Sequence, residues 1–87
     1  MDAARFRKYI RVTTQTTVEQ LFDMVQQNMN KRLSDQEVDE IELWPEGEEQ
    51  FESFLVSKDD SLNWQWCVTE LAKGPEDNLV VEGKVIL

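Results

Sequence analysis

The sequence predicts an α+β fold: one mostly antiparallel sheet of four to five strands, with a single long amphipathic helix over residues 17–31 packed on one face. One segment of the 87-residue chain has helical periodicity, and several short segments alternate apolar and polar residues. No internal repeat or linker divides the chain. Residues 1–87 are therefore expected to form a single small acidic domain around one core.

The first expected element is a strand in RFRKYIRVTT, residues 5–14. Ile10 and Val12 share the parity of its apolar face, which Lys8 interrupts, so an edge strand is expected. The opposite face carries the only basic patch of the chain, and its members are Arg5, Arg7, Tyr9 and Arg11.

The helix is expected next, in TTVEQLFDMVQQNMNKR. Thr17 with Gln20, or Thr16 with Glu19, can form a capping box at its start. The apolar residues fall at helical spacing on a single stripe, which consists of Val18, Leu21, Phe22, Val25 and Met29.

A strand, a Thr-Thr pair and a helix that begins VEQLF resemble the opening of ubiquitin-like domains. The resemblance covers about a quarter of the chain. The first hairpin of that fold would be missing here, so the resemblance is confined to this opening.

The stretch SDQEVDEIELWPEGEEQFE, Ser34–Glu52, contains nine carboxylates and no Lys or Arg. Ser34 and Glu37 form a second candidate capping box. DEIELW alternates and predicts a strand with one solvated face, ended by Pro45 and Gly47. Residues 49–57 fit a helix or a strand, with a slight preference for strand.

Residues 63–71 also fit two structures. Trp64, Cys67, Val68 and Leu71 have helical spacing, whereas aromatic and β-branched residues favour a strand in which Trp64 and Trp66 share a core face. The strand is the prediction. KGPED is an expected loop, and NLVVEGKVIL is a last strand or a tight hairpin about Glu82-Gly83.

The residue types argue against catalysis. The chain has no His, and Cys67 has no neighbouring base, so Cys67 is expected to be a core residue. The three glycines stand too far apart to hold a phosphate. We therefore predict no enzyme, no catalytic residue and no cofactor.

A calcium loop was tested against the acidic stretch, because its acids fall at positions 1, 3, 5 and 12 of such a loop. Glu40 stands where the loop requires glycine, and Pro45 stands at position 11. No metal site is predicted from the four acids concerned, which are Asp35, Glu37, Asp39 and Glu46.

The net charge of −9 is uneven: residues 33–60 carry eleven acids against one base. Such a chain repels nucleic acid and anionic membranes, so neither is an expected direct partner. A lone cysteine, with no apolar run long enough to span a membrane and no secretory signal, predicts a cytoplasmic protein, in the host cytoplasm if a phage encodes it.

The leading functional hypothesis is an inhibitor that mimics nucleic acid. Residues 35–52 would occupy the basic cleft of a larger nucleic-acid-binding protein or nuclease. Small acidic anti-restriction and anti-CRISPR proteins of phages resemble this chain in size and charge. The residues expected to bind the partner are Asp35, Glu37, Asp39, Glu40, Glu42, Trp44, Glu46, Glu48, Glu49 and Glu52.

Two alternatives stay open. The acids can be only a solvated face that keeps the protein soluble. An ordinary interaction or adaptor module would instead use the 5–13 edge strand, through Arg7, Tyr9 and Arg11. A homodimer in which this strand meets the acidic stretch of a second copy is also compatible with the charges. Trp44 fits either an interface residue or the core side of a strand end, and the core is favoured.

Overall fold

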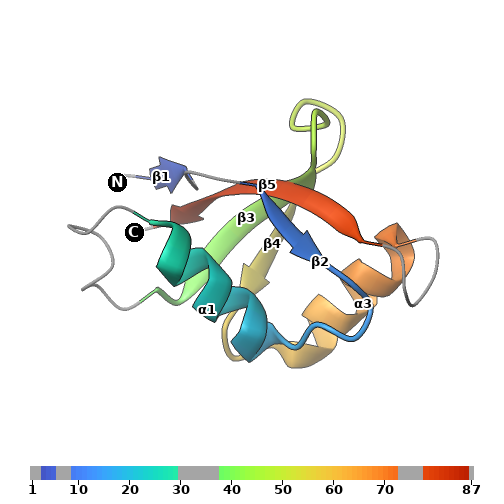
Figure 1. Ribbon diagram of the computed structural model, residues 1–87, viewed down its shortest axis with the longest axis horizontal. Coiled ribbons are helices and arrows are strands. Elements are labelled where there is room, and N and C mark those ends of the chain that lie inside the picture. The colour runs from blue at the N-terminus through green and yellow to red at the C-terminus, as the bar shows by residue number, and fades with distance from the viewer. Residues whose placement is uncertain (1–2, 6–8, 30–37, 73–77, 87) are drawn as a thin grey trace.

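The structure is a computed structural model that describes residues 3–5, 9–29, 38–72 and 78–86. It has an α+β architecture in which one antiparallel sheet carries two helices on one face (Figure 1). In chain order the elements are β1 (Ala3–Arg5), β2 (Ile10–Val12), α1 (Val18–Asn28), β3 (Glu40–Pro45), β4 (Phe54–Ser57), α3 (Ser61–Leu71) and β5 (Leu79–Ile86).

The sheet is four strands across because β1 and β2 lie in line along one edge of β5, followed by β3 and β4. Every described pairing is antiparallel. Arg5 pairs with Lys84, and Ile10 pairs with Val81. Between these two pairs the N-terminal segment covers five residues, whereas β5 covers only three. Of the strand predicted over residues 5–14, the described residues form β2 and the last residue of β1, Arg5, and these pair with β5 in different registers.

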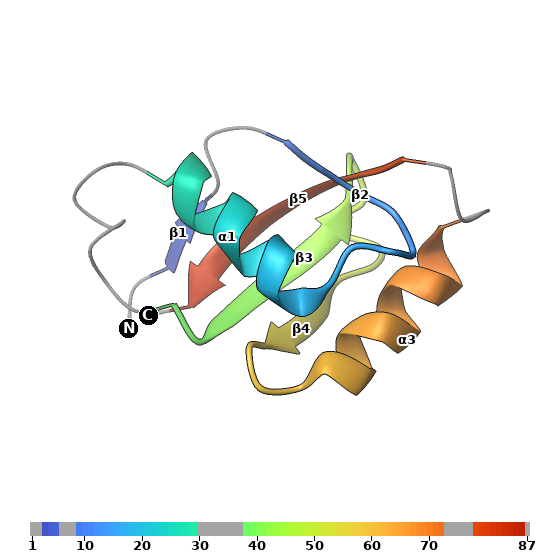
Figure 2. The same ribbon diagram turned by 60° about the horizontal axis from the view of Figure 1, so that its bottom comes forward.

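The hydrophobic core lies between the sheet and the helices. Figure 2 shows α1 crossing the sheet and α3 lying beside β4. Trp64 of α3 is 1% exposed, and its indole Nε1 donates to the carbonyl oxygen of Thr16 at 2.7 Å. Gln65 Nε2 donates to the carbonyl oxygen of Thr14 at 3.0 Å. These two bonds hold α3 against the segment that enters α1.

The first helix is confirmed, and its capping box is the Thr17–Gln20 pair. Its expected extension to residue 31 is wrong, because α1 ends at Asn28 and Met29 has an extended backbone. The Asn28 side-chain amide donates to the carbonyl oxygen of Met24 at 2.8 Å. Asparagine competes in this way for backbone partners, which favours the end of the helix at Asn28.

The prediction of one helix and a strand over 63–71 is wrong, since this segment forms the second helix, α3. Asp60 is its N-cap and accepts from the backbone N–H of Asn63 at 3.1 Å. The helical spacing places Trp64, Cys67 and Val68 in the interior. Trp66, expected to share the core face of a strand, is 64% exposed. A local cap and a core-facing stripe thus outweigh the β propensity of the individual residues.

The remaining strands follow the predictions in part. β3 is confirmed, with Ile41 and Leu43 buried in the core. Only residues 54–57 of the 49–57 segment form a strand. β5 is one continuous strand, so a hairpin about Glu82-Gly83 is wrong. Gly83 is buried opposite Leu43, where it belongs to the core face of β5.

Candidate functional site

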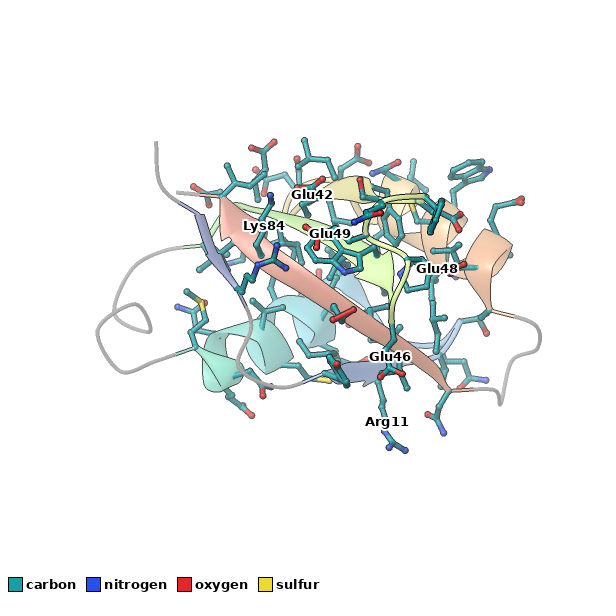
Figure 3. All side chains as sticks on the ribbon, turned by 90° about the horizontal axis from the view of Figure 1, so that it is seen from above. Arg11, Glu42, Glu46, Glu48, Glu49 and Lys84 are labelled. Atoms are coloured by element: carbon teal, nitrogen blue, oxygen red, sulfur yellow. The ribbon has the colours of Figure 1, made fainter. Side chains whose placement is uncertain are left out.

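The face of the sheet turned away from the helices carries most of the charged side chains of β3 and β5. Directly paired residues of neighbouring strands share a face, so this outer face is defined by the pairs Arg5 with Lys84, Glu42 with Lys84, and Trp44 with Glu82. In the view of Figure 3, Glu42, Lys84 and Glu49 lie close together over β3 and β5, whereas Arg11 projects at the margin.

Trp44 is buried on this outer face, at 1% exposure, although it is not a member of the main core cluster. The guanidinium carbon of Arg5 lies 5.4 Å from the centre of its ring, within the range of a cation–π contact. The burial of Trp44 agrees with the preferred interpretation. Its position does not, because Trp44 lies outside the main core cluster, on the face turned away from the helices.

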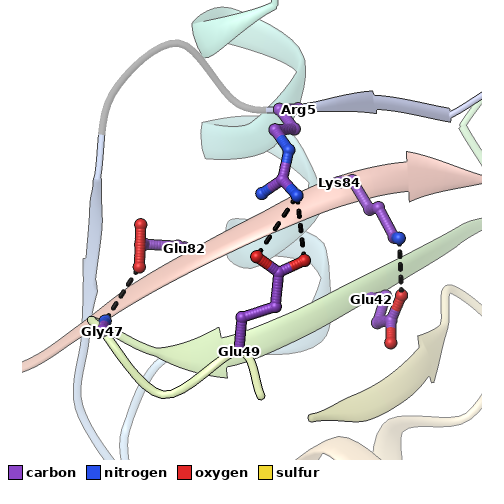
Figure 4. Close-up of polar contacts among 6 residues, drawn as sticks. All are labelled: Arg5, Glu42, Gly47, Glu49, Glu82 and Lys84. Carbon is purple, nitrogen blue, oxygen red and sulfur yellow. Dashed lines mark hydrogen bonds and ion pairs between the residues drawn. The ribbon is translucent and has the colours of Figure 1, made fainter.

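Arg5 also holds the loop that follows β3. One of its terminal nitrogens lies 2.9 and 3.2 Å from the two carboxylate oxygens of Glu49 (Figure 4). This hydrogen bond and the attraction of the Glu49 charge raise the pKa of the Arg5 guanidinium. The two side chains are 61% and 42% exposed, so the ion pair contributes little stability, at most about 1 kcal/mol.

We call residues 46–52 the acidic loop. It rises from the sheet on the side opposite the helices (Figure 1). The backbone N–H of Gly47 donates to Glu82 Oε1 at 2.9 Å, which ties the loop to β5 (Figure 4). The carbonyl oxygen of Glu48 accepts from the N–H groups of Phe51 and Glu52, which closes one helical turn. The backbone N–H of Glu46 also donates to the carbonyl oxygen of Val80 at 3.0 Å. With the Arg5–Glu49 contact, the loop is held to the sheet at three points and folded on itself.

The acidic loop presents three carboxylates and one aromatic ring to solvent. Glu46, Glu48 and Glu52 are exposed, and no ion pair joins them to another residue of the described segments. Phe51 is 84% exposed. The loop therefore brings unpaired carboxylates and an exposed aromatic ring together on one short segment.

The other acids of the predicted site are dispersed. Asp35 and Glu37 lie outside the described residues. Glu42 forms an ion pair with Lys84 at 3.4 Å, and both side chains are about one-third exposed. Asp39 and Glu40 lie at the opposite end of β3 from the acidic loop. The nine carboxylates therefore do not form one uniform array in the part that the structure describes.

The alternative site on the first strand is present in part. Arg7 lies outside the described residues. Tyr9 is 58% exposed, and Arg11 is exposed between the buried residues Ile10 and Val12 of β2. Arg11 also lines a shallow groove beside α1, together with Thr16, Gln20, Asp23 and Met24.

The sequence did not predict a further exposed surface on α3. Leu62 and Trp66 are 83% and 64% exposed and lie four residues apart, on one face of the helix. Trp66 borders an open groove of about 320 Å³ between α3 and the start of β4. The helical alternative for residues 63–71 would have shown that Trp66 falls outside the buried stripe.

Cys67 lies at the floor of this groove and is 4% exposed. Burial raises the pKa of its thiol, with a smaller contribution from the negative charge of Asp60. Its Sγ lies 3.9 Å from Asn63 Oδ1. A buried thiol with a raised pKa is a poor nucleophile.

Within residues 3–5, 9–29, 38–72 and 78–86, no three Asp, Glu or Cys side chains are grouped so as to hold a metal ion. Asp35 and Glu37 of the tested calcium loop lie outside these segments. None of the described helices has both the length and the apolar character that crossing a membrane requires.

Comparison with known proteins gives no assignment. The chain matches no protein-family model, no curated protein and no solved structure.

Proposed function

We propose that this chain is a non-catalytic binding protein that inhibits a larger protein by occupying a basic cleft with its acidic loop. The observation that carries the proposal is the loop itself. Three contacts hold it to the sheet, made by the side chain of Glu49 and the backbone N–H groups of Glu46 and Gly47. Four of its side chains are exposed: Glu46, Glu48, Phe51 and Glu52. A loop fixed before binding loses little conformational entropy on association.

The charge of the loop selects the class of partner. Carboxylates that have no cation of their own attract a positively charged surface and accelerate its association. Glu42 and Glu49 have cations of their own, so we assign them a structural role on the outer face. Basic clefts that accept acidic ligands are typical of nucleic-acid-binding proteins and nucleases, which makes these the proposed partners.

Phe51 adds a contribution that charge alone does not supply. An aromatic side chain at the centre of a protein interface often accounts for much of the binding energy. Its position between Glu48 and Glu52 would let the ring contact an apolar spot while the carboxylates pair with surrounding Lys or Arg residues. The proposal therefore describes an acidic interface with one apolar contact at its centre.

Affinity capture from a bacterial lysate tests this function. The wild type is compared with the loop variant E46Q/E48Q/F51A and with the charge-matched control E19Q/D23N, whose changes lie on the exposed side of α1. DNA- or RNA-binding proteins should be retained by wild type and control and lost by the loop variant. Their retention should fall steeply between about 50 and 500 mM salt, because screening weakens the attraction. The same proteins on all three baits would contradict the proposal.

A second candidate function is supported by the exposure of Tyr9 and Arg11. No described strand pairs with the outer edge of β2, so its backbone groups are open to strand addition by a partner or by a second copy of the chain. The variant Y9A/R11E should then abolish partner capture or dimerisation, while E46Q/E48Q/F51A leaves both unchanged. The reverse pattern would favour the acidic loop.

A further inference from the structure

The groove between α3 and the start of β4 is lined by both apolar and acidic groups. Trp66 forms an exposed part of its wall, and Phe54, Cys67 and Leu71 supply apolar surface. Among the residues that the structure describes, the charged ones that line the groove are Glu52, just before β4, and Glu70, in the last turn of α3, and none is basic.

Three electrostatic features of this groove favour a cation. Glu52 and Glu70 come from the two segments that line it, the end of the acidic loop and the last turn of α3. The groove also lies at the C-terminal end of α3, where the helix dipole is negative and the last turn contains no basic residue. Finally, the face of an exposed indole attracts cations. Lys73, the next cation along the chain, lies outside the described residues.

The geometry points to a docking site for an arginine-containing segment of a partner protein, and we propose this as the occupant. The guanidinium group would stack on Trp66 and pair with the carboxylates of Glu52 and Glu70. Apolar residues beside the arginine would cover Trp66 and Leu62, which continue along the same face of α3. Arginine fits better than lysine, because its planar group stacks on an aromatic ring and pairs with carboxylates at the same time.

This inference rests on the proposed function in one respect, since both assume a positively charged protein partner. The two surfaces can nevertheless be separated by substitution. E46Q/E48Q removes two charges from the acidic loop, and E52Q/E70Q removes the same number from the groove. Glu52 belongs to both surfaces, and it is therefore changed only in the groove variant.

The test uses a defined probe, the blocked peptide acetyl-Gly-Leu-Arg-Leu-Gly-amide, titrated into the ¹⁵N-labelled protein. The three indole N–H signals are the readout. Only Trp66 is exposed, whereas Trp44 and Trp64 are each 1% exposed and serve as internal references. A second peptide with citrulline in place of arginine keeps the shape and removes the charge.

Saturable movement of the Trp66 signal with the arginine peptide, without movement of the Trp44 and Trp64 signals, is the expected result. The E52Q/E70Q variant should bind about tenfold more weakly, as expected for the loss of two partly screened ion pairs. The variant E46Q/E48Q should bind like the wild type. Circular dichroism and the unchanged reference signals check that each variant is folded.

Four results would overturn the inference. With the peptides, these are a Trp66 signal that does not move at millimolar arginine peptide, or a citrulline peptide that binds as tightly as the arginine peptide. With the variants and the protein alone, they are equal weakening of peptide binding in E52Q/E70Q and E46Q/E48Q, or a Trp66 signal that moves with protein concentration in the absence of peptide. The last result would show that a second copy covers the groove. The arginine peptide could fail to bind while the variant E46Q/E48Q/F51A still loses the proteins that the wild type captures. This pair of results would reject the groove and retain the proposed function. The opposite pair of results would reject the proposed function and retain the groove.

Discussion

Trp44 shows at the level of single residues how the outer face of the sheet is organised. Trp44 shares the strand face of Glu40 and Glu42, and it is buried there because Arg5 covers it from β1 and Glu49 holds Arg5 in place. Sequence alone could not predict this cover, because Arg5 is distant from Trp44 along the chain and the contact depends on the strand order. The apolar character of Trp44 was the only local signal.

We expect R5A to lower the free energy of unfolding by about 1 kcal/mol, through loss of an exposed ion pair and a cation–π contact. R5K should have a smaller effect. Only one nitrogen of Arg5 contacts Glu49, so the single amine of lysine can replace this contact, although the stacking over Trp44 is lost. Urea unfolding measures both. The control R11A removes an exposed guanidinium of β2, and equal stability of R5A and R11A would contradict a role for Arg5 as cover.

Gly47 has φ = 82°, a backbone conformation that glycine adopts without strain, and a Cβ added there would meet no atom within 4 Å. The variant G47A should therefore lose about 1 kcal/mol through the backbone alone. Asparagine tolerates this conformation better than alanine, so G47N should be more stable than G47A in the same urea titration. Equal stability of the two variants would show that the loop changes conformation.

At the level of elements, the sequence predicted α1, β3 and the existence of the last strand, because each has one clear period and local end signals. It failed at α3, where both periods fit and the propensity of Trp, Val and Thr favoured a strand. The cap at Asp60 and the covered stripe of Trp64, Cys67 and Val68 decide for a helix. This error also hid the groove, since it placed Trp66 in the core.

The cap of α3 provides a matched pair of variants. D60A should lower the free energy of unfolding by about 1 kcal/mol, because the N–H of Asn63 loses its acceptor. D59A removes the same charge one residue earlier, at an exposed position, and should have little effect. D60N, which keeps a capping oxygen, should retain most of the stability. Thermal unfolding followed by circular dichroism distinguishes the three, and equal losses in D59A and D60A would point to charge instead of capping.

For the whole molecule, the sequence predicted the fold class and the antiparallel sheet, but it did not predict the strand order or the in-line arrangement of β1 and β2. Composition identifies the acidic segment along the chain. It could not separate Glu42 and Glu49, which have ion-pair partners, from Glu46, Glu48 and Glu52, because that distinction depends on which cations the fold brings near. The candidate site was thus predicted as a segment and not as a surface.

The net charge of −9 makes self-repulsion a property of the whole fold. Raising NaCl from about 20 to about 200 mM should therefore increase the midpoint of urea unfolding, since the screening length falls from roughly 20 Å to below 10 Å. At low salt the variant E46Q/E48Q should be more stable than the wild type, and its unfolding midpoint should change less with added salt. A midpoint that falls with salt would mean that the ion pairs Arg5–Glu49 and Lys84–Glu42 outweigh the repulsion.

The position of β5 has a consequence for biosynthesis. This strand is the last described element, yet it pairs with β1, β2 and β3, and Ala3 lies opposite Ile86. On the ribosome, α1, α3 and the β3–β4 hairpin are made without the strand on which the sheet depends. We therefore expect the sheet to stay incomplete, and its strand edges open to chaperones and proteases, until residues 79–86 have left the exit tunnel.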